Sequence, residues 1–164
     1  MSGAVYVASA RPERPESPVL VVACSKGSYL AATREFLERH LGLPDGGYHL
    51  LAVPGGPQFL VLSEHLPKFA WAGHRWVRFA NEKMGVTRVV LVAHEGCLWY
   101  EDERFVPALL HRLSSHGGTA AEHQRDDLRR AAEGLRGLGL PLAVEAYFIS
   151  DGADGRLEFH KEAV

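Results

Sequence analysis

Two runs of consecutive apolar residues constrain the fold of this chain more than any other feature. Residues 19–23 read Val-Leu-Val-Val-Ala and residues 89–93 read Val-Val-Leu-Val-Ala, with no polar side chain in either run. A strand that is apolar at every position has no face to turn toward water, so both of its faces must be covered. The two runs therefore predict central strands of a parallel sheet packed between helices.

Strand-like and helix-like segments alternate along the chain. We expect strands over residues 19–23, 48–53, 89–93, 142–149 and 156–160. We expect helices over residues 29–41, 64–84, 105–116 and 119–138. This order is typical of an α/β fold with a mostly parallel central sheet of about four strands, flanked by helices, to which the last segment adds a short edge strand. Ser28 and Thr119 are predicted to cap the first and the last helix.

The chain has the organisation of a single domain. A length of 164 residues suits one domain, and an apolar fraction of 46% is enough to fill its core. Residues 1–18 contain the stretch Arg-Pro-Glu-Arg-Pro-Glu-Ser-Pro, which predicts an extended, flexible arm. We therefore expect the folded domain over residues 19–164. The charged segment 124–130 is predicted to form a solvated outer face of the last helix.

Composition argues against several classes of partner. The net charge of -2 does not provide the basic surface that nucleic acids require. No apolar stretch approaches the roughly 20 residues that span a bilayer, and residues 1–18 lack the pattern of a secretory signal. Two cysteines cannot build a secreted disulfide framework, so we expect a cytoplasmic location.

Both cysteines and one histidine lie at or just after predicted strand ends. Cys24 directly follows the run 19–23, His94 directly follows the run 89–93, and Cys97 comes three residues later. The carboxyl ends of parallel strands meet at one edge of a sheet, so these side chains are expected to converge. Two thiolates and an imidazole suit zinc and leave a fourth position open. We therefore predict Cys24, His94 and Cys97 as zinc ligands.

Three other interpretations of these residues stay open. Cys24 and Cys97 are alternatively structural thiols beside a core histidine, because free cysteine is often buried. A disulfide between them is a second alternative, which a reducing compartment disfavours. The third is Cys24 as the nucleophile of a phosphate-binding loop, but the arginine expected six residues later is Leu30 here.

Two further residues are candidates for the chemistry of the site. Lys26 lies near the start of the first predicted helix, where free backbone N–H groups attract anions, so the expected ligand is a small molecule or an anion. The alternative is a solvent-facing loop lysine. Glu95 is the carboxylate nearest to the ligands in sequence and is a candidate general base, unless it points away as a loop residue. The Pro-Gly-Gly-Pro segment at 54–57 should allow close approach of backbone to a ligand.

With these pieces the chain resembles the β-class carbonic anhydrases. That family is α/β and builds its zinc site from a cysteine after the first strand and a His-x-x-Cys pair after a later one. The matching pieces are Val-Val-Ala-Cys24 and His94-Glu95-Gly96-Cys97. The resemblance covers roughly residues 19–160 and includes the small-residue loop at 54–57. It implies a zinc cofactor and a homodimer or higher homo-oligomer that buries a long helix, for which residues 67–80 are the candidate.

One departure from the family bears on activity. The family reads Cys-x-Asp-x-Arg at its first cysteine, where the aspartate contacts the zinc-bound water or ligates zinc, and the arginine holds the aspartate. Lys26 and Ser28 stand at these two positions here. A lysine ammonium cannot accept a proton or serve as an anionic ligand, so CO2 hydration requires another group to replace the missing pair.

Two function classes follow from the resemblance and this departure. The first is a zinc-dependent lyase or hydrolase that uses zinc-bound water on a small electrophile. The alternative is a non-catalytic, zinc-stabilised binding or regulatory protein of the same fold. A metal-free anion-binding domain is a third and weaker alternative.

Overall fold

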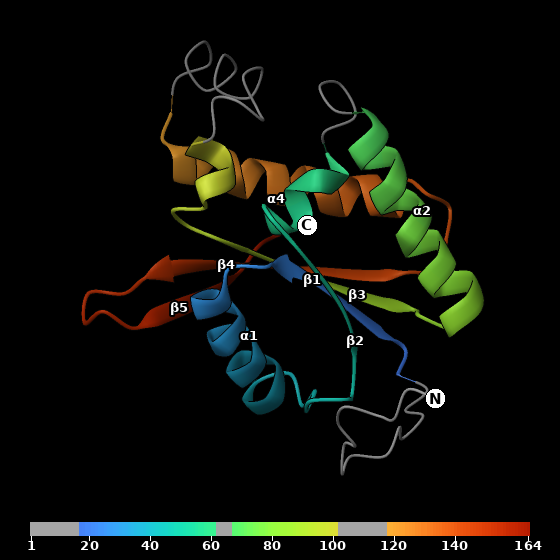
Figure 1. The fold of residues 1–164 in the computed structure, drawn as a ribbon, viewed down its shortest axis with the longest axis horizontal. Helices are drawn as coiled ribbons and strands as arrows, with labels where there is room; N and C mark the ends of the chain where they lie inside the picture. The colour runs from blue at the N-terminus through green and yellow to red at the C-terminus, as the bar shows by residue number, and fades with distance from the viewer. Residues whose placement is uncertain (1–16, 62–66, 102–117) are drawn as a thin grey trace, which may run out of the picture.

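The computed structural model describes residues 17–61, 67–101 and 118–164, and Figure 1 shows their arrangement. The described residues form a five-stranded sheet in the order β2-β1-β3-β4-β5. The strands are β1 (Val19–Cys24), β2 (His49–Val53), β3 (Arg88–His94), β4 (Ala143–Asp151) and β5 (Leu157–Lys161). All neighbours pair in parallel except β5, which pairs antiparallel with β4. The predicted α/β fold with an added edge strand is confirmed.

Helices cover both faces of the sheet. Helix α1 (Gly27–Arg39) lies on one face, whereas α2 (Pro67–Met84) and α4 (Ala120–Arg136) lie on the other (Figure 1). Two short 3-10 helices, η1 (Gly56–Leu60) and η2 (Leu98–Glu101), follow β2 and β3. The sheet is therefore the middle layer of three, which is the arrangement that its apolar strands require.

The side chains of β1 alternate between two apolar cores. Leu20 and Val22 pack beneath α2 and α4, whereas Val21 and Ala23 pack beneath α1. Val21 and Val22 are both 0% exposed, so neither face of the strand reaches water. This double burial explains why the sequence of β1 is apolar at every position.

The register of the sheet places the carboxyl ends of three strands at one edge. Ala23 of β1 lies opposite Ala52 of β2 on one side and Val92 of β3 on the other. The next residue of β1 is Cys24, and β3 ends at His94. The side chains predicted to bind zinc therefore leave the sheet at the same edge.

The start of α1 differs from the prediction. Lys26 is the residue before the helix, its side chain makes no capping hydrogen bond, and the helix begins at Gly27. The prediction that Ser28 caps the helix is therefore wrong, because Ser28 already lies inside the first turn. At the last helix the prediction is confirmed, since Thr119 accepts a hydrogen bond from the Glu122 backbone in a capping box.

The prediction of a solvated outer face over residues 124–130 is wrong for three of these residues. Gln124, Asp127 and Leu128 are 2%, 1% and 1% exposed. They recur at intervals of three and four residues, which places them on the face of α4 that packs toward the sheet and η1. The charges of Arg129 and Asp126 lie on the exposed face, as predicted.

Several predictions concern residues outside the described ranges, namely the helix over 105–116, the start of the helix over 64–84 and most of the N-terminal arm. Ser17 and Pro18, which end that arm, contact the domain. Ser17 donates a hydrogen bond to the Gly47 carbonyl, and the Pro18 carbonyl accepts from the backbone of Thr87 and Arg88. Among the helices in the described ranges, none has the length and apolar character needed to cross a bilayer.

Candidate metal centre

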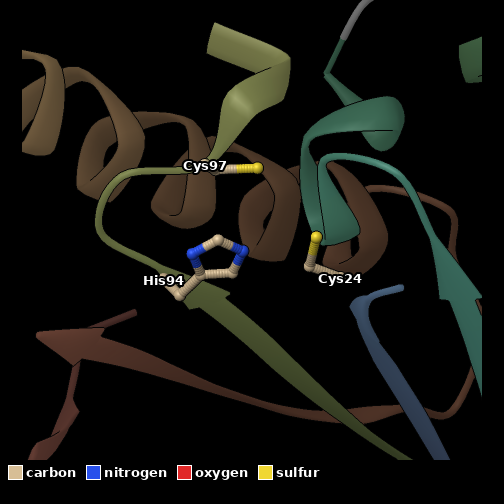
Figure 2. Close-up of side chains that lie close together, drawn as sticks. All are labelled: Cys24, His94 and Cys97. Atoms are coloured by element: carbon tan, nitrogen blue, oxygen red, sulfur yellow. The ribbon is translucent and has the colours of Figure 1, made fainter. Parts of the chain in front are cut away.

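Cys24, His94 and Cys97 converge at the edge of the sheet, as predicted. One possible ligand atom from each lies within 4.8 Å of the other two, and the group could hold a metal ion. Figure 2 shows the two sulfur atoms and the imidazole ring turned toward a common space. Cys24 ends β1, His94 ends β3, and Cys97 lies in the turn before η2. Their exposed fractions are 7%, 3% and 5%, so the group is shielded from water.

Backbone and aromatic contacts fix the orientation of the His94 ring. Nδ1 of His94 lies 2.8 Å from the Glu95 carbonyl oxygen, which can only accept, so Nδ1 carries the proton. Nε2 then presents a lone pair, and it is buried with no hydrogen-bond partner among the described residues. The ring also stacks on Tyr29, with centroids 3.7 Å apart. This is the tautomer and orientation in which a histidine binds a metal through Nε2.

Both sulfur atoms accept hydrogen bonds from backbone N–H groups. Lys26 donates to Cys24, and Trp99 and Gly55 donate to Cys97. The hydrogen bond to the Cys97 thiol, the neighbouring His94 and the Lys26 N–H together lower the pKa of Cys24 to about 4, although burial acts in the opposite direction. The same hydrogen bond and burial raise the pKa of Cys97. The pair therefore keeps one proton at neutral pH, and the backbone donors stabilise the negative charge on sulfur.

The glycine loop after β2 brings backbone against the site, as its sequence predicts. Gly55 and Gly56 have φ angles of 81° and 58°, in the left-handed region that favours glycine. A Cβ added at Gly56 would lie 2.9 Å from the backbone nitrogen of Cys24. The turn therefore needs two glycines, and it is this turn that directs the Gly55 N–H to Cys97.

Lys26 and Glu95, the two further candidates from the sequence, lie beside the three predicted ligands and are not part of the group that could bind a metal. The Lys26 side chain is exposed, with its ammonium 5.1 Å from the centroid of the Tyr29 ring. The Glu95 backbone serves the site, because its carbonyl accepts from Tyr29 and His94 while its N–H donates to Ile149. Within the described ranges, the side chains that could together bind a metal ion are Cys24, His94 and Cys97, and the Glu95 carboxylate is not among them.

A small cavity adjoins the ligands. It has room for about one water molecule. Its wall combines ligand residues, loop residues and residues of α4, among them His94, Cys97, Gly55, Gln58, Tyr100 and Gln124. Sequence reasoning missed Gln58 and Gln124, since no local pattern marks a glutamine that tertiary packing buries.

Solved structures share this fold. A carbonic anhydrase from Streptococcus mutans has a TM-score of 0.56 and 17% identity to the chain, covering 93% of this chain and 87% of that one. A β-carbonic anhydrase from Trichomonas vaginalis has a TM-score of 0.57 and 13% identity, with coverages of 97% and 90%. The chain has the β-carbonic anhydrase fold.

A carbonic anhydrase from Glaciozyma antarctica is a further structure of this kind, with a TM-score of 0.54, 19% identity and coverages of 88% and 82%. Such identities establish a common β-carbonic anhydrase fold and nothing finer. No protein-family model and no curated protein matches the chain in sequence. The residues of the site must therefore carry the argument for function.

Proposed function

We propose that this chain is a zinc protein of the β-carbonic anhydrase fold, with Cys24, His94 and Cys97 as ligands. The observation that carries the proposal is the convergence of three buried ligand atoms within 4.8 Å, one of which belongs to a histidine whose Nε2 has no partner in the described part of the chain. Sulfur and imidazole ligands suit zinc, whereas magnesium and calcium prefer oxygen.

A zinc ion with three protein ligands leaves one position open and supplies a Lewis acid that lowers the pKa of water there. The residues of the chain prepare this position. The Glu95 carbonyl and the Tyr29 ring hold the imidazole, and backbone N–H groups hold the two sulfurs. The proposed reaction is addition of water to a small electrophile, carbon dioxide being the substrate of the carbonic anhydrases that the fold resembles.

Lys26 and Glu95 are the proposed accessory residues. The Lys26 ammonium lies over the Tyr29 ring, and the same ring stacks on His94. A cation so near the ligands favours an anionic substrate or product. Glu95 follows His94 directly and is half-buried, so its carboxylate is the proposed proton acceptor.

A second candidate function is a zinc-stabilised binding protein without catalysis. The observation that favours it is the loop after Cys24, where the resemblance expects an aspartate and an arginine. Lys26 and Ser28 occupy these positions, and both are exposed. Neither side chain can take over the proton-accepting role of a carboxylate near the metal.

Metal content and activity separate these candidates. Zinc is measured in purified protein and in the Cys24→Ser and Cys97→Ser variants, and CO2 hydration is followed by stopped flow. We expect one zinc per chain, lost in both variants. Zinc with hydration supports the enzyme. Zinc without hydration, unchanged in a Lys26→Asp/Ser28→Arg double variant, supports the binding protein. Absence of zinc from the wild-type chain would overturn both.

We also propose that the chain forms a homodimer through α2. The buried face of this helix consists of small residues and Val77, while large aromatic side chains lie on its exposed face. Phe69, Trp71, Trp76 and Phe79 are 52%, 63%, 49% and 57% exposed. An apolar surface of this kind marks an interaction site. Light scattering of the wild type and of a Trp76→Glu variant tests it, with a shift from dimer to monomer expected.

The proposed location is the cytoplasm. Cys24 and Cys97 are both free thiols, and a reducing compartment keeps them available as ligands.

A further inference from the structure

The cavity beside the metal centre contains both glutamines of the chain. The sequence has two, at positions 58 and 124, and the fold brings them to one cavity from η1 and α4. Gln58 is 3% exposed and Gln124 is 2% exposed. His94 and Cys97, two of the three proposed ligands, line the same cavity. The two glutamines and two of the proposed ligands therefore share one cavity.

The polar atoms of these glutamines are buried without partners. Neither Nε2 nor Oε1 of Gln58 has a hydrogen-bond partner in the described part of the chain, and the same is true of Oε1 of Gln124. Burying an amide without a partner is unfavourable, and apolar residues of the same size would avoid the loss. Because both ends of the Gln58 amide are unpaired, the cavity offers a donor and an acceptor whichever way that amide is turned.

We propose that Gln58 and Gln124 are positioning residues for the molecule bound at the open metal position. This inference rests on the proposed zinc function. The space admits one group of the size of water, so only one small end of the bound molecule enters it. The side-chain carbonyl oxygens of Gln58 and Gln124 each need a hydrogen-bond donor, and the Gln58 amide nitrogen needs an acceptor. The preferred ligand is a compact planar molecule that ends in a hydroxyl or amino group, such as a protonated oxyacid or an amide.

Two anions of equal shape and charge test this selectivity. Hydrogen carbonate and nitrate are both planar, trigonal and singly charged, but only hydrogen carbonate has a hydroxyl group to donate. The protein is loaded with cobalt in place of zinc, and the visible absorption of the cobalt–thiolate centre is titrated with each anion. The quantity compared between variants is the ratio of the two affinities, because the intrinsic preference of the metal cancels in that comparison.

The test variants are Gln58→Met and Gln124→Met, which keep the volume and remove the amide. Hydrogen carbonate has one hydroxyl proton, so we expect the variant that removes the carbonyl oxygen accepting this proton to lower the ratio of hydrogen carbonate to nitrate affinity by about tenfold, the loss of one well-placed hydrogen bond. Cobalt content should stay at the wild-type level. The matched control is Thr33→Val, which removes a polar group buried at 3% exposure on α1, on the other face of the sheet, and should leave the ratio unchanged.

The possible results separate this inference from the zinc proposal. Metal binding with an unchanged ratio in both glutamine variants overturns the inference and leaves the zinc proposal standing. Failure of the wild type to bind metal overturns both. If Gln58→Met does not fold, as judged by circular dichroism, Gln58→Asn replaces it, because the shorter side chain withdraws the amide from the cavity by one methylene, and the expectation and the refutation stay the same.

Discussion

Tyr29 and His94 stack ring on ring and donate to the same oxygen, the backbone carbonyl of Glu95. The ring centroids are 3.7 Å apart with an angle of 15° between the planes. The Tyr29 hydroxyl lies 3.2 Å and His94 Nδ1 lies 2.8 Å from the shared carbonyl. One residue of α1 thus fixes the plane of the imidazole and shares the hydrogen-bond acceptor that sets its tautomer. Tyr29 lies five residues after Cys24, so the same short segment supplies a ligand and orients another.

Removing the Tyr29 ring should weaken metal binding although the ring is not a ligand. Contacts that orient a ligand change metal affinity by about 10–100-fold. We expect zinc affinity to fall by about tenfold in Tyr29→Leu and by less in Tyr29→Phe, which keeps the stack and loses the hydroxyl. Competition with a chromophoric chelator measures both. Equal affinities in the wild type and Tyr29→Leu would show that the stack has no influence on the metal.

Zinc affinity should depend on pH through the thiol pair. The pKa of Cys24 is lowered to about 4 and that of Cys97 is raised, so one proton stays on the pair through the neutral range. Zinc binds thiolates, and this proton must leave when the metal binds. We expect affinity to rise by about tenfold per pH unit between about pH 6 and 8, measured with a chelator of known protonation. An affinity independent of pH would mean that both sulfurs are already ionised.

Two glycines in helix interiors should respond oppositely to alanine. A Cβ at Gly73 of α2 would lie 2.0 Å from the buried Phe59 ring, whereas a Cβ at Gly134 of α4 would be 4.0 Å from its nearest neighbour, His74. We expect Gly73→Ala to destabilise the fold by about 1–3 kcal/mol through overpacking. Gly134→Ala should stabilise it by about 0.5–1 kcal/mol through helix propensity. Urea unfolding measures both, and destabilisation of equal size would contradict this view of the packing.

The ion pair of Arg88 and Glu145 should stabilise the sheet at neutral pH only. Burial acts to raise the pKa of Glu145, but hydrogen bonds from Arg88 and Tyr147 and the charge of Arg88 outweigh it and lower the pKa overall. A carboxyl whose pKa is lower in the folded state adds stability above its unfolded pKa and loses it as the pH falls through the folded value.

We therefore expect Arg88→Met to lower the free energy of unfolding by about 1 kcal/mol at pH 7. This loss should become smaller when the pH falls below 4.5, the ordinary pKa of glutamate. Unfolding in urea at pH 7 and pH 3 provides the comparison. Arg39→Met is the control, because Arg39 and Glu35 form a more exposed ion pair, at 78% and 62%, which should contribute close to nothing. A loss at pH 3 as large as at pH 7 would count against the ionic origin.

The sequence was informative where one local pattern decides the outcome. An apolar run such as residues 19–23 has one way to avoid water, and the carboxyl ends of parallel strands meet at one edge. The convergence of Cys24 and His94 follows from these two facts alone. Thr119 with Glu122 is likewise a local signal, since the capping box needs no partner elsewhere in the chain.

Tertiary packing decided what the sequence did not reveal. Gln124 and Asp127 lie in a charge-rich segment, but they are buried because α4 packs against η1 and the sheet, and Tyr100 donates a hydrogen bond to Asp127. The stack of Tyr29 on His94 joins residues 65 positions apart, and no local sequence pattern predicts it. Ser28 had the residue type of a helix cap, but α1 starts one residue before it.

The strand order has a consequence for synthesis on the ribosome. β1 is translated well before β3, yet β3 is one of its two partners and covers the edge that faces the centre of the sheet. Until β3 emerges, a nascent chain exposes this apolar strand with one edge unpaired, a form prone to aggregate. Slow decoding between these two strands should therefore lower the yield of native protein, and chaperones that hold extended apolar segments should restore it.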